Sequence, residues 1–192
     1  MRRYVTLRQP ESLPLRAVKH MPHPIINLAD VELQPLPPGF APGGTAAERF
    51  DPRIGRVSGP LGAQKLGYNV TVLAPGKRAF PFHNHRVNEE MFLVLDGTGE
   101  VRIGDARHPI RNGDIIACPS GGPESAHQII NTGTAELRYL AVSTQQLPEV
   151  CEYPDSAKHA VMADFGPDIG GKPQIFRSVG RSGTSLDYWE GE

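Results

Sequence analysis

The chain has 192 residues, a formal net charge of -1 at pH 7 and a pI near 6.7. This balance argues against nucleic acids and membrane surfaces, which attract proteins with clustered basic charge, so we expect neither as a partner. No apolar run approaches the roughly 18 residues of a spanning helix, and the first residues lack a hydrophobic signal core, so a cytoplasmic location is expected. Cys118 and Cys151 show no CxxC spacing and are expected to be buried free thiols.

Residues 1–65 contain ten of the 19 prolines, which excludes a continuous helix or a central strand there. Apolar residues such as Ile26, Val31 and Phe40 are spaced along the same segment, and a disordered tail would be poorer in them. We therefore expect an extended arm that packs along the domain or across to a second subunit, with a loose tail over residues 1–20. A capping-box pattern, Thr45 with Glu48, favours a short helix near residues 45–50.

From Leu66 onward, short runs rich in Val, Ile, Leu, Tyr and Thr alternate with turn residues roughly every 8–12 positions, as in antiparallel sandwiches and barrels. Turns at Pro75-Gly76, Gly104-Asp105 and Asn112-Gly113 separate these runs. Strands are expected near residues 66–74, 79–85, 89–96, 99–104, 106–110, 114–118, 126–130, 136–143 and 158–163. No 10–15 residue stretch has helical periodicity, so the predicted fold class is all-β.

The predicted organisation is an arm over residues 1–65, a β-barrel over 66–163 and a C-terminal tail over 164–192. The strands expected at 89–96 and 136–143 are apolar on both faces, whereas a sheet with one wet face would alternate. We therefore expect the arm and the partner of a homodimer to cover the outer face together. Tyr188 and Trp189 are expected to dock on the barrel or on the dimer partner.

The segment from Gly76 to Gly97 contains three candidate metal ligands, His83, His85 and Glu90, and His127 follows as a fourth. Histidines at i and i+2 of a strand point to the same face, whereas a helix would separate them. Three imidazoles and one carboxylate suit Zn, Fe, Mn or Ni and leave coordination positions open, as catalytic sites do. The alternative interpretation is ordinary strand histidines with a surface glutamate.

These residues carry a resemblance to the cupin superfamily. Its first motif is similar to Gly76, His83, His85, Glu90 and Gly97, and its second to Gly113, Pro119, Gly121, His127 and Asn131. The chain departs from the family pattern by one extra residue before His83 and by five residues, instead of two, between Gly121 and His127. The resemblance implies a double-stranded β-helix, the cupin jelly-roll barrel, with a divalent metal in its mouth.

Glu89 competes with Glu90 as the carboxylate ligand, and adjacent strand residues face opposite ways. Glu90 keeps the six-residue interval to Gly97, so Glu89 is expected to face outward and to pair with Arg86 or Arg102.

The pocket residues are predicted from aromatic content and from loop composition. Tyr68, Phe82 and Phe92 are expected to bind substrate, with an aromatic core as the alternative. Glu124 lies in a glycine-containing loop directly before His127, so it is expected to reach the metal as a general base, with an outward acidic residue as the alternative.

Three functions fit these features. The first is a small metalloenzyme of the dioxygenase or the isomerase/lyase type, acting on a small polar metabolite. The second is a metal-dependent binding protein for a sugar or small acid, without turnover. The third, an effector-sensing regulatory module, is weakened because the sequence has no helix-turn-helix pattern or basic patch. A sugar-phosphate isomerase would also need a basic cradle for the phosphate, which the sequence does not locate.

Overall fold

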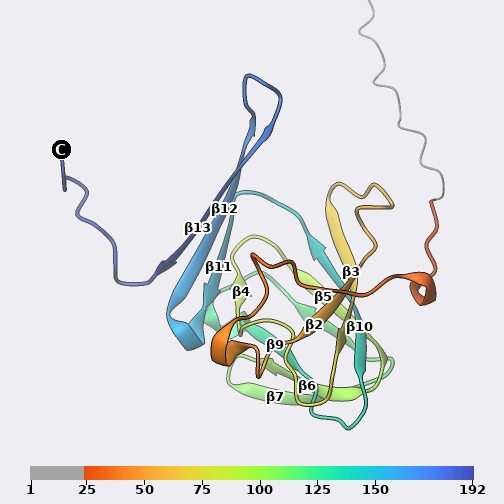
Figure 1. Ribbon diagram of the computed structural model, residues 1–192. Helices are drawn as coiled ribbons and strands as arrows, with labels where there is room; N and C mark the ends of the chain where they lie inside the picture. The colour runs from red at the N-terminus through yellow and green to blue at the C-terminus, as the bar shows by residue number, and fades with distance from the viewer. Residues whose placement is uncertain (1–23) are drawn as a thin grey trace, which may run out of the picture.

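The computed structural model describes residues 24–192 and consists mainly of antiparallel strands in three sheets (Figure 1). In spatial order the first sheet contains β1 (Gln34–Pro35), β2 (Pro52–Arg56), β3 (Leu66–Leu73), β10 (Leu137–Thr144), β5 (Glu90–Asp96) and β8 (Ile115–Cys118). The second contains β13 (Pro173–Arg181), β12 (Lys158–Pro167), β11 (Glu149–Tyr153) and β4 (Asn84–His85). The third contains β7 (Ala106–Arg111), β6 (Thr98–Ile103) and β9 (His127–Ile130).

The helices are short 3₁₀ turns: η1 (Leu28–Asp30), η2 (Gly44–Ala46), η3 (Pro123–Ser125) and η4 (Pro154–Ser156). Within residues 24–192, no helix has the length and apolar character needed to cross a membrane.

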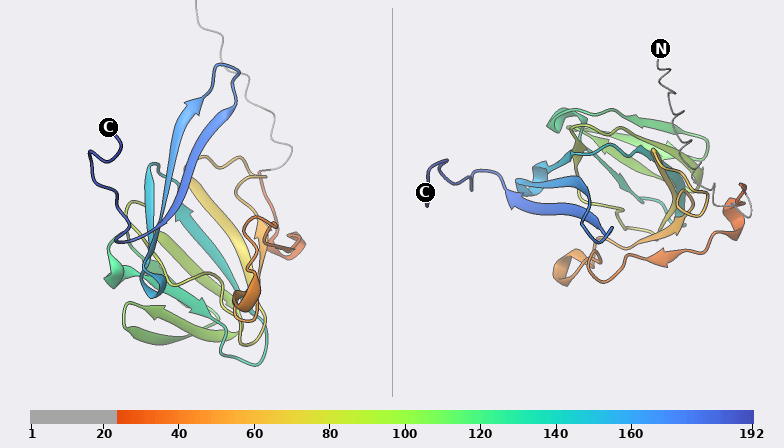
Figure 2. Two further views of the ribbon diagram at one scale, coloured as in Figure 1. Left: turned by 60° about the vertical axis from the view of Figure 1, so that its left-hand side comes forward. Right: turned by 90° about the horizontal axis from the view of Figure 1, so that it is seen from above.

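The core lies inside the curled sheets, which enclose it when the barrel is seen from above (Figure 2). Alternate residues of β3, β5 and β10 point inward, as the two-residue period of a strand requires. Leu73, Val94, Leu137 and Tyr139 are each at most 1% exposed in this core. The antiparallel strands that surround this core confirm the predicted all-β fold class.

A second apolar layer lies outside the barrel. Val57, Val70 and Val72 form a buried cluster there, and the N-terminal segment packs onto it through Ile26, Leu28, Val31 and Leu33. The guanidinium group of Arg138 donates a hydrogen bond to the carbonyl of Leu28. The apolar outer residues of β3 and β10 are therefore covered by this chain's own arm.

Lys77 also ties the arm to the barrel. Its ammonium donates to the carbonyl of Glu48 at 2.8 Å, beside η2. Arg78 continues the contact, because its backbone N–H donates to the Arg49 carbonyl at 2.8 Å. Residues 44–50 make one 3₁₀ turn followed by an i to i+4 hydrogen bond, close to the short helix predicted there.

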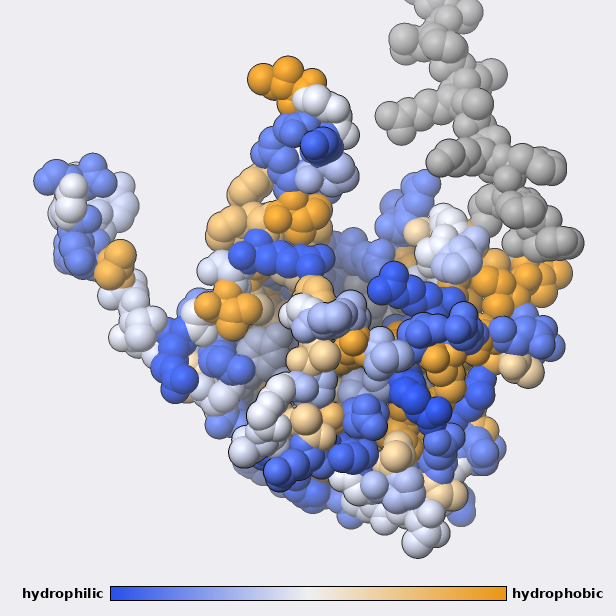
Figure 3. Space-filling view, viewed as in Figure 1, coloured by the Kyte–Doolittle hydropathy of each residue, from blue (hydrophilic) through white to orange (hydrophobic). Residues whose placement is uncertain are grey.

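The observed strands differ from the predicted ones in several places, and neither β1 nor β11 was predicted. β2 lies in the segment predicted as an arm and pairs with β3 along its whole length. The predicted strand at 79–85 is mostly irregular, because Pro81 lacks a backbone donor, and only β4 is formed. β12 continues to Pro167 and pairs with the unpredicted β13 to form a hairpin that projects beyond the barrel (Figures 1 and 3).

The C-terminal aromatic residues do not dock on the barrel. Tyr188 is 85% exposed and Trp189 is 72% exposed, and their rings meet edge to face with centroids 4.9 Å apart. Of the two predicted docking surfaces, the barrel does not cover these side chains, and docking on a dimer partner stays a prediction.

Candidate metal centre

Three sheets meet at the mouth of the barrel and supply one cluster of side chains. His83 and His127 face each other across an antiparallel bridge: His83 N–H donates to the His127 carbonyl at 3.2 Å, and His127 N–H donates back at 2.8 Å. His85 lies in β4 and pairs with Cys151 of β11, while Glu90 begins β5. Backbone pairing therefore fixes the position of each candidate ligand.

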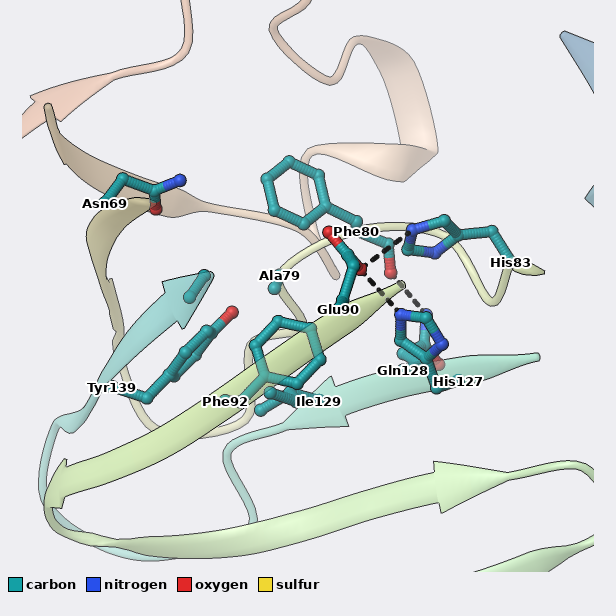
Figure 4. Close-up of a pocket in the computed structure, with 11 residues that line it drawn as sticks. Asn69, Ala79, Phe80, His83, Glu90, Phe92, His127, Gln128, Ile129 and Tyr139 are labelled. Carbon is teal, nitrogen blue, oxygen red and sulfur yellow. Dashed lines mark hydrogen bonds and ion pairs between the residues drawn. The ribbon is translucent and has the colours of Figure 1, made fainter. Parts of the chain in front are cut away.

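The three predicted histidine ligands converge on one oxygen of the fourth, Glu90 Oε2. This atom lies 2.8 Å from His127 Nε2, 3.6 Å from His85 Nε2 and 3.9 Å from His83 Nε2. Figure 4 shows His83 and His127 pointing at Glu90 from the same side. One ligand atom from each of His83, Glu90 and His127 lies within 4.8 Å of the others, a spacing that can hold a metal ion. The structure thus brings together the residues that the motif spacing predicted.

The far ring nitrogens of His83 and His127 are occupied by backbone carbonyls. His83 Nδ1 lies 2.8 Å from the Pro81 carbonyl oxygen, and His127 Nδ1 lies 3.3 Å from that of Ser125. A carbonyl only accepts, so we assign the proton of the neutral His83 ring to Nδ1, which directs the lone pair of its Nε2 at the centre. His127 Nε2 lies 2.8 Å from the Glu90 carboxylate, which also only accepts, so this nitrogen donates to Glu90, and a bound metal would take the place of that proton.

His85 is also held through its Nδ1, but by side chains instead of a backbone carbonyl. Its Nδ1 lies 3.3 Å from Cys151 Sγ and 3.5 Å from Glu149 Oε2, while its buried Nε2 has no hydrogen-bond partner. A buried nitrogen without a partner is costly, and a cation between it and Glu90 would satisfy it. The donor set therefore fits a divalent metal.

The pKa values indicate which side chains of the cluster are charged. Burial, with the neighbouring His127, lowers the pKa of His83 to about 4, so this imidazole is neutral. Burial opposes charge on His85 as well, yet the neighbouring Cys151 and Glu90 side chains raise its pKa to about 10, so this ring carries the positive charge beside Glu90 when no metal is bound. Burial would also raise the pKa of Glu90, but its contacts with His127 and His85 hold it well below the usual range. Glu90 is thus an anion that needs a cation beside it.

A buried carboxylate, Glu149, supports the centre from behind. Its side chain is 1% exposed and accepts hydrogen bonds from the backbone N–H groups of Arg86 and Val87 at 3.1 Å and of Asn88 and Val150 at 2.8 Å. The Asn88 side-chain amide donates to the same carboxylate. These bonds hold the loop that joins β4 to β5, so one group orients the segment between two of the candidate ligands.

A pocket of about 180 Å³ opens beside the centre, and Figure 4 shows its lining. Its walls are mainly apolar and aromatic, with two side-chain amides and three of the candidate ligands. The lining residues are Asn69, Ala79, Phe80, His83, Glu90, Phe92, His127, Gln128, Ile129, Tyr139 and Ala141.

Of the three predicted substrate-binding residues, the structure places only Phe92 in this pocket. Tyr68 packs on the outer cluster under the arm, because it shares a strand face with Val70. Phe82 is 4% exposed and lies under the guanidinium group of Arg102, whose central carbon is 3.5 Å from the ring centroid. The structure thus places both rings outside this pocket, in packing positions.

The structure does not bring Glu124 to the centre. Glu124 is exposed, and its carboxylate accepts a hydrogen bond from the Gly122 N–H at 2.8 Å within the same loop. Glu89 is exposed as expected, but the predicted ion pairs are not formed: Arg86 pairs with Glu152 instead. Local turn bonding, which acts over two residues, competes successfully with a distant metal site.

Sequence reasoning missed several residues of the site. Asn69 and Tyr139 could have been found, since they share the inward face of their strands with known core positions. Gln128 adjoins a predicted ligand, and its amide donates to the Phe80 carbonyl at 2.7 Å. Glu149 gives no signal, because it lies 59 residues beyond Glu90 and outside both motifs.

Comparison with known proteins agrees with this geometry. The Cupin_2 family, described as a cupin domain, matches residues 69–143. Protein SchB from Streptomyces halstedii is 32% identical over 111 residues, which cover 57% of this chain and 72% of SchB. This chain belongs to the cupin superfamily.

Solved structures extend the agreement over most of the cupin chain. A sugar phosphate isomerase of the cupin superfamily from Silicibacter pomeroyi has a TM-score of 0.67 and 24% identity, covering 86% of this chain and 98% of its own. The polyketide cyclase RemF from Streptomyces resistomycificus has a TM-score of 0.50 and 20% identity, covering 65% and 82%. At these identities the likeness concerns the fold, and it confirms the predicted cupin barrel.

Proposed function

We propose that this cupin is a metal-dependent enzyme that holds one divalent transition metal through His83, His85, Glu90 and His127. One observation carries the proposal: three imidazole Nε2 atoms surround a single carboxylate oxygen, while each Nδ1 faces another acceptor. Three neutral imidazoles and one carboxylate bind Zn, Fe, Mn or Ni and leave coordination positions for a substrate.

A bound metal would supply Lewis-acid or redox chemistry at the wall of the pocket. The chain's own residues bind and orient the substrate there. Phe92 and Phe80 offer ring faces, and the amides of Asn69 and Gln128 offer hydrogen bonds. Iron in the site would favour a dioxygenase, whereas zinc or manganese would favour an isomerase or lyase.

A second candidate function is metal-dependent binding without turnover, and the small number of acid–base groups in the described pocket lining favours it. Burial raises the pKa of Tyr139 above its ordinary value, so its hydroxyl stays protonated. Apart from the candidate ligands, Tyr139 is the one titratable side chain among the described residues that line the pocket. The described lining therefore offers no separate general base. Product formation from a bound small molecule distinguishes the two functions.

The metal assignment is tested by replacing one ligand. We expect the His85→Ala protein to lose stoichiometric metal while its far-UV circular dichroism remains that of a β-protein. His108 is an exposed strand residue outside the cluster, so His108→Ala is the matched control and should keep one metal per chain. Elemental analysis of protein purified without chelator or affinity metal gives the content and identifies the metal. Unchanged metal content in His85→Ala would refute the site.

We also propose that a second copy covers the part of the outer sheet face that the arm leaves open. Strand register places Leu140, Leu93 and Ile115 in one row across β10, β5 and β8. The arm packs against the first of these, whereas Ile115 at the far end of the row is 69% exposed. β8 is also an edge strand, which invites pairing or coverage.

The dimer proposal predicts a specific response to charge. We expect Ile115→Lys to convert a dimer into a monomer in size-exclusion chromatography with light scattering. Val179, which is 70% exposed on the projecting hairpin, provides the control Val179→Lys, expected to leave the dimer intact. A dimer that survives Ile115→Lys and is lost with Val179→Lys would place the interface on the hairpin and refute this one.

A further inference from the structure

The side chains of β10 that face the barrel interior become more exposed from one end of the strand to the other. Along β10, Tyr139 is 1% exposed, Ala141 and Ser143 are half-buried, and Gln145 is exposed, so depth decreases toward the C-terminal end of the strand. Glu90 pairs with Ser143 and therefore lies between the deep, aromatic part of this face and its polar rim.

Two pockets meet at this level, and Glu90 lines both. The aromatic pocket is the 180 Å³ pocket described above, walled by Phe80, Phe92 and Tyr139. The amide pocket, of about 460 Å³, is walled mainly by uncharged polar side chains. The residues of the amide pocket are Gln64, His85, Asn88, Glu90, Ser143, Thr144, Gln145, Gln146, Leu147, Glu149, Met162 and Asp164.

The shape and chemistry of the aromatic pocket suit a ring. A cavity of about 150 Å³ lined by apolar side chains accommodates benzene, so this volume holds a single ring with small substituents. Phe92 stands edge to face against Tyr139 with centroids 5.7 Å apart, which leaves ring faces toward the pocket. Asn69 and Gln128 at the same wall provide uncharged hydrogen-bonding groups for oxygen substituents.

Among the described residues, neither pocket has a basic side chain other than the candidate ligand histidines to balance a phosphate charge. Among the described residues that line them, none is Lys or Arg, while Glu90, Glu149 and Asp164 are acidic. A buried phosphate needs cationic or multiple N–H donors to offset the loss of its hydration.

Three basic side chains near the pockets are engaged elsewhere. Lys77 bonds the carbonyl of Glu48 in the arm, and Arg86 pairs with Glu152 at 2.8 Å. Arg102 pairs with Asp155 at 2.8 Å. Recruiting any of them to a ligand would break these contacts.

We infer that the substrate of this cupin is an uncharged ring compound bearing hydroxyl or carbonyl oxygens, and not a sugar phosphate. Its ring occupies the aromatic pocket, one oxygen lies at the Glu90 level, and its remaining polar substituents extend into the amide pocket. This inference rests on the proposed metal function, because the metal level is the point where the two pockets meet. The inferred substrate also differs from a sugar phosphate, the substrate class in the name of the structurally similar isomerase.

A matched pair of ligands tests the inference on the full chain loaded with its own metal. Phenol and phenyl phosphate share the ring and differ by the phosphate, and ribose 5-phosphate represents a sugar phosphate. Isothermal titration calorimetry and ligand-observed NMR measure binding. We expect phenol to bind at least about tenfold more tightly than either phosphate, a difference of roughly 1.4 kcal/mol.

Two variants of β10 locate the bound ring. Ala141→Leu fills the aromatic pocket without touching a candidate ligand, and it should weaken phenol binding by roughly tenfold or more. Val142→Phe adds at least as much bulk on the opposite strand face and should bind phenol as the unmodified protein does.

The outcomes separate this inference from the metal proposal. Metal content is measured first in every sample, so its absence would refute the proposed function directly. With metal present, failure to bind phenol, or equal or tighter binding of phenyl phosphate, would overturn the uncharged-ring inference while leaving the metal site intact. Unaltered phenol affinity in Ala141→Leu would overturn the placement of the ring.

Discussion

Glu149 provides a stringent test of how the centre is built. Glu149→Gln keeps the shape of the side chain and removes one of its two acceptor oxygens. Oε1 accepts from the N–H groups of Arg86, Val87 and Val150, and Oε2 accepts from the backbone and side-chain nitrogens of Asn88. A glutamine that keeps its oxygen at Oε1 would direct its NH₂ group at two donors.

The expected loss of stability in Glu149→Gln follows from the number of hydrogen bonds lost. Hydrogen bonds to a charged group contribute about 1.5–3 kcal/mol each when measured by substitution, and two are replaced by donor–donor contacts in a site that is 1% exposed. Partial relaxation of the loop reduces the sum, so we expect a loss of about 3 kcal/mol in the free energy of unfolding. For a domain of this size, that corresponds to a decrease in Tm of roughly 6–12 °C.

Urea denaturation followed by circular dichroism measures the loss, and Glu152→Gln is the matched control. Glu152 is on the same strand, but its side chain is 29% exposed and pairs with Arg86, so its replacement should cost about 1 kcal/mol or less. Metal affinity should fall by roughly 10–100-fold only in Glu149→Gln, because this carboxylate orients the loop between His85 and Glu90. Equal stability and equal metal affinity in the two variants would refute the reasoning.

Three further predictions use the same structure. Gly97 has φ of +83° and a Cβ there would overlap a neighbouring backbone carbonyl, whereas Gly76, with φ of +76°, faces open space. In urea denaturation, Gly97→Ala should therefore lose at least about 2 kcal/mol more free energy of unfolding than Gly76→Ala. Equal losses in the two variants would contradict this. Cys118 and Cys151 are 3% and 5% exposed, and burial raises the pKa of Cys118 to about 12, so almost none of its reactive thiolate is present near neutral pH. An aromatic disulfide reagent at pH 8 should label both thiols only after unfolding, and prompt labelling of the native protein would contradict this. Trp189 is the single tryptophan and is 72% exposed, so iodide should quench its fluorescence nearly as well as that of free tryptophan; protection at the lowest protein concentration would show that it is covered.

The ligand cluster could be predicted from the sequence because its rule is local. Alternation along a strand places His83 and His85 on one face and separates Glu90 from Glu89, and the structure shows both arrangements. The all-β fold class followed from turn spacing, which is also a short-range property.

The pocket walls could not be predicted in the same way, since alternation identifies two faces without showing which is inside. Tyr68 has the size and polarity of a pocket residue, yet its face lies under the arm, and Asn69 on the other face lines the pocket instead. Glu149 was invisible because its role depends on β11 pairing beside β4, a contact between distant segments. Roles that depend on pairing between distant segments therefore could not be predicted from the local sequence pattern.

The lengthened loop beside His127 illustrates why a departure in motif spacing need not disturb a site. Its extra residues fold into η3, and the Glu124 carboxylate closes the turn on the Gly122 N–H. The loop is attached at its start, where the Gly121 N–H donates to the His85 carbonyl at 2.8 Å, and at its end by the backbone bridge between His127 and His83. Ligand positions are thus set by pairing across the sheets, and the number of residues between two anchored points can vary at little cost, since closure entropy grows slowly with loop length. The same attachment explains why Glu124, expected to act at the metal, stabilises the loop instead.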